Sequence, residues 1–298
     1  MLETPLQTPP HPSPSRAMIT VREVKCSTLL HRMNYGSVTE YTANLYRGCT
    51  HGCTYCYAPS LIHDERGWGS YVDVKANAPQ VLERELRGLR RDTVFLSSAS
   101  DPYQPVEAKY GLTRRCLRSL LRHRFPVSVL TRSPLVLRDL DLLKRFESVE
   151  VGMSITTVPV RQFEPGVPPL QRRMETLRTL AGAGIPTWVS LAPVIPGIVM
   201  VDLERLFEDL KGAGVSAVRF GLLRFAGYEE SKRMFEASAG IELAAALAGW
   251  EELQERLTSL IRRYGMEPRD EVRRKKKDDD EEEVVGPGAG FASLDDFR

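Results

Sequence analysis

The sequence lacks several features that would place the protein in a specialised class. Its 298 residues contain no apolar run approaching the roughly 18 residues of a membrane-spanning helix. The opening MLETPLQTPPHPSPSR has no basic region followed by an apolar stretch, as a secretory signal peptide has. The formal net charge is only +2, so the whole chain shows no electrostatic footprint for nucleic acid. These absences predict a cytoplasmic protein in a reducing compartment, with no membrane partner.

Cysteine is scarce and unevenly distributed. Three of the five cysteines lie within residues 44–59, NLYRGCTHGCTYCYAP, as Cys49, Cys53 and Cys56. Thiolates are soft ligands that select zinc, copper(I) or iron–sulfur clusters. Structural zinc normally takes four protein ligands and an iron–sulfur cluster usually takes four thiolates, whereas this loop offers three. A cubane held by three cysteines leaves one iron open to a small molecule, so the loop predicts a reactive centre.

Two other classes of protein stay open at this point. His51 could complete a Cys3His zinc site, although two ligands inside the three-residue gap after Cys49 would be crowded. A non-catalytic zinc module or an electron carrier is therefore one alternative, although a ferredoxin would normally be smaller and have four cysteines per cluster. A DNA-binding protein is the other, because arginines are frequent in residues 84–91 and 114–124. The pattern there is more typical of a solvated surface.

The cysteine loop, with Tyr55 just before the third cysteine, resembles that of the radical S-adenosylmethionine (SAM) enzymes. The resemblance implies that Cys49, Cys53 and Cys56 hold a 4Fe–4S cluster whose open iron binds SAM. It further implies reductive cleavage of SAM to methionine and a 5'-deoxyadenosyl radical, which abstracts a hydrogen atom. An external electron donor of the flavodoxin or ferredoxin type is then a required partner.

Further motifs resemble the spore photoproduct lyase-like branch of that superfamily. Residues 97–114 read SSASDPYQPVEAKYGLTR and match its DPYQP-x-E…LTR signature. Residues 192–197, APVIPG, also match, and Glu164-Pro165 and Arg172-Arg173 echo the intervening segment. These matches cover about half of the chain, from residue 44 to residue 197. They leave the substrate unknown, with nucleic acid as one possibility.

The resemblance also suggests residues for SAM binding, at positions where predicted strands end. The Gly-Gly-Glu stretch that often binds the methionine amino group is absent, and we expect Ser98, Ser100 and Asp101 to replace it. The remaining expected contacts are an arginine for a carboxylate, two hydroxyls for a ribose or carboxylate, and two residues beside the adenine: Arg132, Ser154, Thr156, Pro193 and Tyr55. Cys116, in a predicted helix, is a weaker candidate for a catalytic hydrogen-atom donor, because most helical cysteines are buried and inert.

Strand-like and helix-like segments alternate through the middle of the chain. Six apolar strands are predicted at residues 42–46, 93–98, 127–131, 149–156, 186–192 and 217–222. Five amphipathic helices are predicted between them, at residues 79–91, 112–124, 135–146, 169–183 and 201–213. Such alternation predicts an α/β fold with a parallel sheet, and the resemblance implies an open, partial TIM-type (β/α)6 barrel.

The chain is accordingly divided into five segments. Residues 1–17 are predicted to be a disordered tail, and residues 18–41 an irregular N-terminal cover. Residues 42–228 form the predicted barrel, followed by a helical segment at residues 229–265 with a break near Gly240. Residues 266–298, which contain RRKKKDDDEEE, are predicted to be a disordered charged tail.

Overall fold

The computed structural model describes residues 19–35, 38–64, 66–96, 98–157, 160–199, 201–223, 225 and 229–269. The predicted tail at residues 1–17 and most of the predicted charged tail lie outside these ranges. None of the described helices combines the length and the apolar composition that crossing a bilayer requires.

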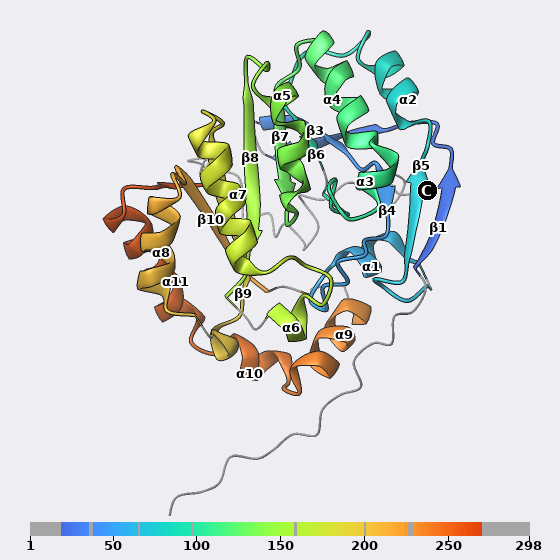
Figure 1. Cartoon of the computed structure of the whole chain (residues 1–298). Coiled ribbons are helices and arrows are strands. Elements are labelled where there is room, and N and C mark those ends of the chain that lie inside the picture. The colour runs from blue at the N-terminus through green and yellow to red at the C-terminus, as the bar shows by residue number, and fades with distance from the viewer. Residues whose placement is uncertain are drawn as a thin grey trace, which may run out of the picture.

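A mostly parallel sheet forms the centre of the molecule (Figure 1). Its strand order is β11-β10-β9-β8-β7-β6-β3-β2, and all neighbours are parallel except β2 and β3. The bounds of these strands are Leu30–Tyr35 (β2), Val38–Ala43 (β3), Val94–Leu96 (β6), Val127–Thr131 (β7), Val149–Ile155 (β8), Thr187–Val194 (β9), Ala217–Leu222 (β10) and Glu267–Pro268 (β11). Within the described residues, β2 and β11 are the two edges, so the sheet is an open partial barrel as predicted.

Helices cover the outer face of this sheet, as the alternation in the sequence predicted (Figure 1). Each follows one strand and precedes the next, so the connections are the crossovers that parallel strands require. Their bounds are Ala78–Glu85 (α2), Glu107–Tyr110 (α3), Leu112–Arg122 (α4), Leu140–Leu143 (α5), Val160–Phe163 (α6), Leu170–Gly182 (α7) and Leu203–Gly212 (α8), with 3-10 turns at Pro134–Asp139 (η1) and Pro196–Ile198 (η2). The apolar faces of α2 and α4 are buried against the sheet, together with strand residues such as Val94 and Val129.

The N-terminal segment differs from its prediction. Residues 18–41 were expected to be irregular, but they contain β1 (Thr20–Val24), β2 and the start of β3. β1 belongs to a small second sheet with β5 (Tyr71–Lys75) and β4 (Tyr46–Arg47), in the order β1-β5-β4. The expectation failed because β1 is mostly exposed and is defined by pairing with residues about fifty positions away.

The C-terminal helical segment forms three helices, α9 (Glu229–Ala239), α10 (Leu243–Leu247) and α11 (Trp250–Arg263). The predicted break near Gly240 is confirmed, since Gly240 has a positive φ of 68° between α9 and α10. The boundary predicted at residue 266 is wrong, because β11 continues the fold and Arg269 binds Glu150 on β8. α9 lies beside α1 (Ala58–Ile62) and α6, so it reaches the cysteine loop (Figure 1).

Candidate metal and cofactor site

The three clustered cysteines lie in the loop between β4 and α1, near the carboxyl ends of the parallel strands. We call residues 48–57 the cysteine loop. Cys49 and Cys53 are buried, and Cys56 is partly buried. Burial and, next, the nearby Asp101 carboxylate raise the pKa of the Cys49 thiol to about 12. Burial also raises the pKa of Cys53, which is raised further by Cys56 and Cys49, so the three thiols lie within electrostatic reach of one another.

The arrangement of these thiols bears on which metal centre they fit. Ligands of one tetrahedral zinc ion lie about 2.3 Å from the metal, and hence roughly 3.8 Å from each other. In the part of the chain that the structure describes, no three His, Cys, Asp or Glu side chains are placed to share a single ion. A cubane binds each thiolate through a different iron, so its ligands stand farther apart. The described loop brings three cysteines together, which is the number of protein ligands that a cubane with one open iron takes.

Hydrogen bonds from distant segments fix the shape of the cysteine loop. On one side the buried Gln104 carboxamide accepts from the Thr50 amide (3.1 Å) and donates to the Gly48 carbonyl (3.2 Å). Gly48 has φ of +85° and a Cβ there would lie 2.5 Å from the Tyr71 carbonyl oxygen, so only glycine fits. The DPYQP motif thus contributes a side chain, that of Gln104, which binds the backbone of the cysteine loop. The sequence analysis did not predict this role.

Asp101 connects the DPYQP segment to the end of β7. Its carboxylate accepts from the Thr131 hydroxyl (2.6 Å) and from the amides of Arg132 (2.7 Å) and Tyr103 (2.8 Å). The His51 imidazole lies beside it, with Nδ1 3.5 Å from Oδ2, and burial lowers the pKa of His51. A carboxylate offers about four acceptor positions, so three are already used within the protein. Asp101 is therefore first an anchor of the site.

Of the two serines predicted after β6, Ser98 already forms hydrogen bonds within the protein, one of them with Tyr57. The Ser98 hydroxyl accepts from Asn44 Nδ2 (2.9 Å) and from the Thr42 hydroxyl (3.1 Å), and its carbonyl accepts from Tyr57. The Ser100 hydroxyl is buried and has no hydrogen-bond partner among the described residues. Asn44, which the sequence analysis did not select, also accepts from the Ala99 amide (2.9 Å).

A buried ionic group joins Tyr55 to the ends of β7 and β8. The Tyr55 hydroxyl donates to Glu164, whose other oxygen accepts from Arg173 (3.0 Å). Arg132 Nε lies 3.5 Å from Glu164, and the guanidinium also acts electrostatically on Cys53. Arg173 is fully buried and donates to the Ser154 carbonyl (2.8 Å). The sequence analysis predicted Tyr55, Arg132 and Ser154 as site residues. It named Glu164 and Arg173 only as residues that match the family motif.

Two of the remaining predicted residues lie near these groups and one does not. Thr156 follows β8 and Pro193 is within β9, and both are buried close to the strands' carboxyl ends. Cys116 is fully buried in the core on α4. Its electrostatic neighbours are Glu107, Arg115 and Cys26, none of which is a predicted site residue, and burial raises its thiol pKa. The structure therefore does not bring Cys116 to the site.

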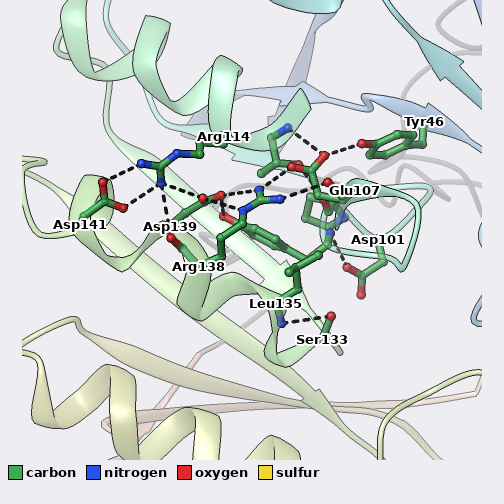
Figure 2. Close-up of polar contacts among 12 residues, drawn as sticks. Tyr46, Asp101, Glu107, Arg114, Ser133, Leu135, Arg138, Asp139 and Asp141 are labelled. Carbon is green, nitrogen blue, oxygen red and sulfur yellow. Dashed lines mark hydrogen bonds and ion pairs between the residues drawn. The ribbon is translucent and has the colours of Figure 1, made fainter. Parts of the chain in front are cut away.

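A second ionic network joins α3, α4 and η1 and contacts Tyr103 of the DPYQP segment (Figure 2). Glu107 and Asp139 are fully buried and share Arg138, which lies 2.6 Å from Glu107 and 2.8 Å from Asp139. Asp139 also binds Arg114 (2.9 Å) and the Tyr103 hydroxyl (3.1 Å). The network fixes Tyr103, and with it the neighbouring residues that contact β7 and the cysteine loop.

Comparison with known proteins identifies the family to which this constellation belongs. The model of the radical SAM superfamily matches residues 43–210, more than half of the chain. The chain belongs to the radical SAM superfamily. Radical SAM proteins use a 4Fe–4S cluster and SAM, which are therefore the cofactors of this protein.

Three relatives show how far the similarity extends along the sequence. An uncharacterized protein of Methanocaldococcus jannaschii is 37% identical over 178 residues, 58% of this chain and 66% of the relative. An uncharacterized protein of Mycobacterium tuberculosis is 34% identical over 222 residues, 68% of this chain and 65% of the relative. A radical SAM Nalpha-GlyT isomerase of Pseudomonas phage M6 is 31% identical over 195 residues, 63% of this chain and 40% of the relative. The chain thus spans just under two thirds of the first two relatives and less of the third.

Solved structures of spore photoproduct lyase share the fold. One, complexed with dinucleoside spore photoproduct, has a TM-score of 0.64 at 18% identity and covers 84% of this chain and 81% of its own. A variant with bound AdoMet and dinucleoside spore photoproduct has a TM-score of 0.66 at 16% identity, covering 88% and 87%. Radical SAM proteins with this fold are open TIM-type barrels, in agreement with the sheet described above.

Proposed function

We propose that this protein is a radical SAM enzyme in which Cys49, Cys53 and Cys56 ligate the 4Fe–4S cluster. The observation that carries the proposal is a three-thiol loop, shaped by distant hydrogen bonds, at the carboxyl ends of a parallel sheet. Ligands gather at this edge in open α/β sheets. When bound and reduced, the cluster supplies the electron that splits SAM into methionine and a 5'-deoxyadenosyl radical. Hydrogen abstraction from a substrate then follows.

The chain's own residues would bind and orient SAM at this edge. Arg132 offers a guanidinium whose geometry matches a carboxylate. Ser100 offers a buried hydroxyl that no group in the described part of the chain binds. The other proposed contacts come from the cysteine loop, the DPYQP segment and the ends of β8 and β9: Tyr55, Ser98, Asp101, Ser154, Thr156 and Pro193. Asp101 would accept from the SAM ammonium in addition to the three described donors that it already binds.

Partner and substrate are proposed at the level of chemical class. An external one-electron donor of the flavodoxin or ferredoxin type would reduce the cluster. The cytosol would keep the three thiols reduced and available. For the substrate we propose a nucleic-acid base as the first class to assay, since the similar spore photoproduct lyase structures contain a dinucleoside photoproduct.

The decisive experiment is anaerobic reconstitution with iron and sulfide, followed by dithionite and SAM. The expected result is 5'-deoxyadenosine, quantified by mass spectrometry, in samples that contain about four iron and four sulfide atoms per chain. Cys53→Ala is the matched negative control. A cluster-loaded wild-type sample that forms no 5'-deoxyadenosine would reject the enzyme assignment. A zinc-bound sample with no cluster would favour the metal-binding module instead.

A further inference from the structure

A short segment at the end of α6 lies against the cysteine loop. We call residues 163–166, Phe-Glu-Pro-Gly, the FEPG segment. The Thr54 amide donates to the Phe163 carbonyl (3.0 Å), and the Gly166 amide donates to the His51 carbonyl (2.9 Å). The Tyr55 hydroxyl donates to the Glu164 carboxylate. Three hydrogen bonds therefore tie the stretch between the first and third cysteines to a segment more than a hundred residues away.

Gly166 shows how closely the two segments approach. A Cβ at this position would lie 2.4 Å from the Thr50 carbonyl oxygen and 2.9 Å from His51 Cα. Both neighbours are backbone atoms, so neither can rotate away. Gly166 is not among the residues with positive φ, so its backbone conformation does not itself require glycine. The requirement comes from the cysteine loop, which passes where a side chain would be.

Glu164 is held in place from the side away from the cysteine loop. Its side chain is 1% exposed, and the fully buried Arg173 binds it at 3.0 Å. Arg173 is itself fixed by the Ser154 carbonyl at the end of β8. Burying a charged pair costs desolvation energy that apolar residues of the same volume would not incur. Packing alone therefore gives no reason for a carboxylate here, whereas positioning the Tyr55 hydroxyl and the Arg132 guanidinium does.

We propose that the FEPG segment is the non-ligating half of the cluster site, and that Glu164 is a positioning residue acting through Tyr55 and Arg132. The segment holds the cysteine loop in its ligating shape before the cluster binds. This proposal rests on the proposed function, because it assumes that the three cysteines hold the cluster. It has a steric part, carried by Gly166, and an electrostatic part, carried by Glu164. The two parts are tested separately.

The steric part is tested with Gly166→Ala. Gly182 provides the matched control, since a Cβ there would meet no atom within 4 Å and its φ is not positive. We expect Gly166→Ala to retain less than half of the wild-type iron and sulfide after reconstitution. We also expect it to lose its visible cluster absorbance to an iron chelator at least fivefold faster. Gly182→Ala should match the wild type in both measurements, and circular dichroism of the apo-proteins checks that both variants are folded.

The electrostatic part is tested with Glu164→Gln, which keeps the side-chain size and removes one negative charge. We expect the midpoint potential of the bound cluster to rise, because the added electron is then repelled less. A residue with a merely structural role would lower cluster content without moving the potential of the clusters that remain. The potential is measured by anaerobic redox titration followed by electron paramagnetic resonance. Gly182→Ala again serves as the control.

These outcomes separate the two levels of proposal. Wild-type iron content and chelator resistance in folded Gly166→Ala would overturn the steric part. An unchanged midpoint potential in Glu164→Gln would overturn the electrostatic part. If the wild type itself bound no cluster, the proposed function would fail instead. If the wild type bound a cluster but did not cleave SAM, the FEPG comparison would still be decided, because none of its readouts requires SAM.

Discussion

The two arginines of the network behind the DPYQP segment should differ strongly in their contribution to stability (Figure 2). Arg138 and Arg114 have nearly equal side-chain exposures, 27% and 26%. Arg138 is the cation that binds Glu107 within the described chain, at 2.6 Å. Replacing it by methionine leaves the fully buried Glu107 with neutral donors only, the Tyr46 hydroxyl and the Thr113 amide. An uncompensated buried charge of this kind typically costs about 3–5 kcal/mol.

Arg114→Met is the matched comparison and should cost much less. Arg114 binds the buried Asp139 at 2.9 Å and Asp141, whose side chain is 60% exposed. After the substitution Asp139 still has Arg138 and the Tyr103 hydroxyl. The exposed pair with Asp141 contributes at most about 1 kcal/mol. We therefore expect Arg138→Met to lower the free energy of unfolding by roughly 2 kcal/mol more than Arg114→Met does.

Urea unfolding followed by circular dichroism, on anaerobic samples with matched cluster content, measures this difference. A second substitution, Glu107→Gln in the Arg138→Met background, should recover part of the loss because it removes the unpaired charge. Equal losses from the two arginine substitutions, or no recovery of stability in the double variant, would refute the buried-charge reasoning.

Three further predictions concern other parts of the molecule. Cys53→Ala should leave the chain folded but reduce bound iron to a small fraction of the wild-type value, as measured by colorimetric iron analysis. Cys116→Ala should lower stability by about 2 kcal/mol or less, as a small truncation in the core does, while forming 5'-deoxyadenosine at the wild-type rate. Hydrogen bonds from Arg66 hold the pKa of Asp64 at about 2, below its usual value. That stabilisation is complete above the unfolded pKa near 4 and is lost as the pH falls through 2. Asp64→Asn should thus cost on the order of 1–2 kcal/mol at pH 7, with the loss shrinking in acid unfolding experiments near pH 2.

The barrel could be predicted from the sequence because its elements have strong local patterns. The strand predicted at residues 127–131 is β7, and the strand predicted at residues 217–222 is β10. Most residues of β7 are buried, and β10 is half-buried with Val218 in the core, so local composition and tertiary environment agree. The small sheet was missed for the opposite reason. β5 contains Asp73, which is buried and binds the partly exposed Arg66 at 2.6 Å. A charged residue inside a short strand makes the strand look solvent-exposed in the sequence.

The site was predictable where a residue type has few alternative uses, and less so elsewhere. The spacing of the cysteines pointed to a metal centre because three thiols within eight residues have few structural uses. Asp101 and Arg132 were selected because they follow predicted strands, and the structure places them together. Glu164 and Arg173 could not be assigned in this way. Charged residues in a loop or on a helix normally face solvent. Only the structure shows that Glu164, which follows α6, and Arg173, on α7, are both buried and lie 3.0 Å apart.

The surroundings of the cysteine loop divide into an apolar part and a polar part, and the two have different consequences. Phe163, Phe225 and Phe235 pack with Cys53 and Tyr55, and α9 brings the last of the three phenylalanines. Apolar packing excludes water but is non-directional, so it cannot by itself set the direction of a thiol or a hydroxyl. Gln104 and the FEPG segment orient the cysteine loop through hydrogen bonds to its backbone amides and carbonyls. The cysteine spacing therefore indicates which residues are the proposed ligands, whereas their orientation is a tertiary property that residues 44–59 alone do not encode.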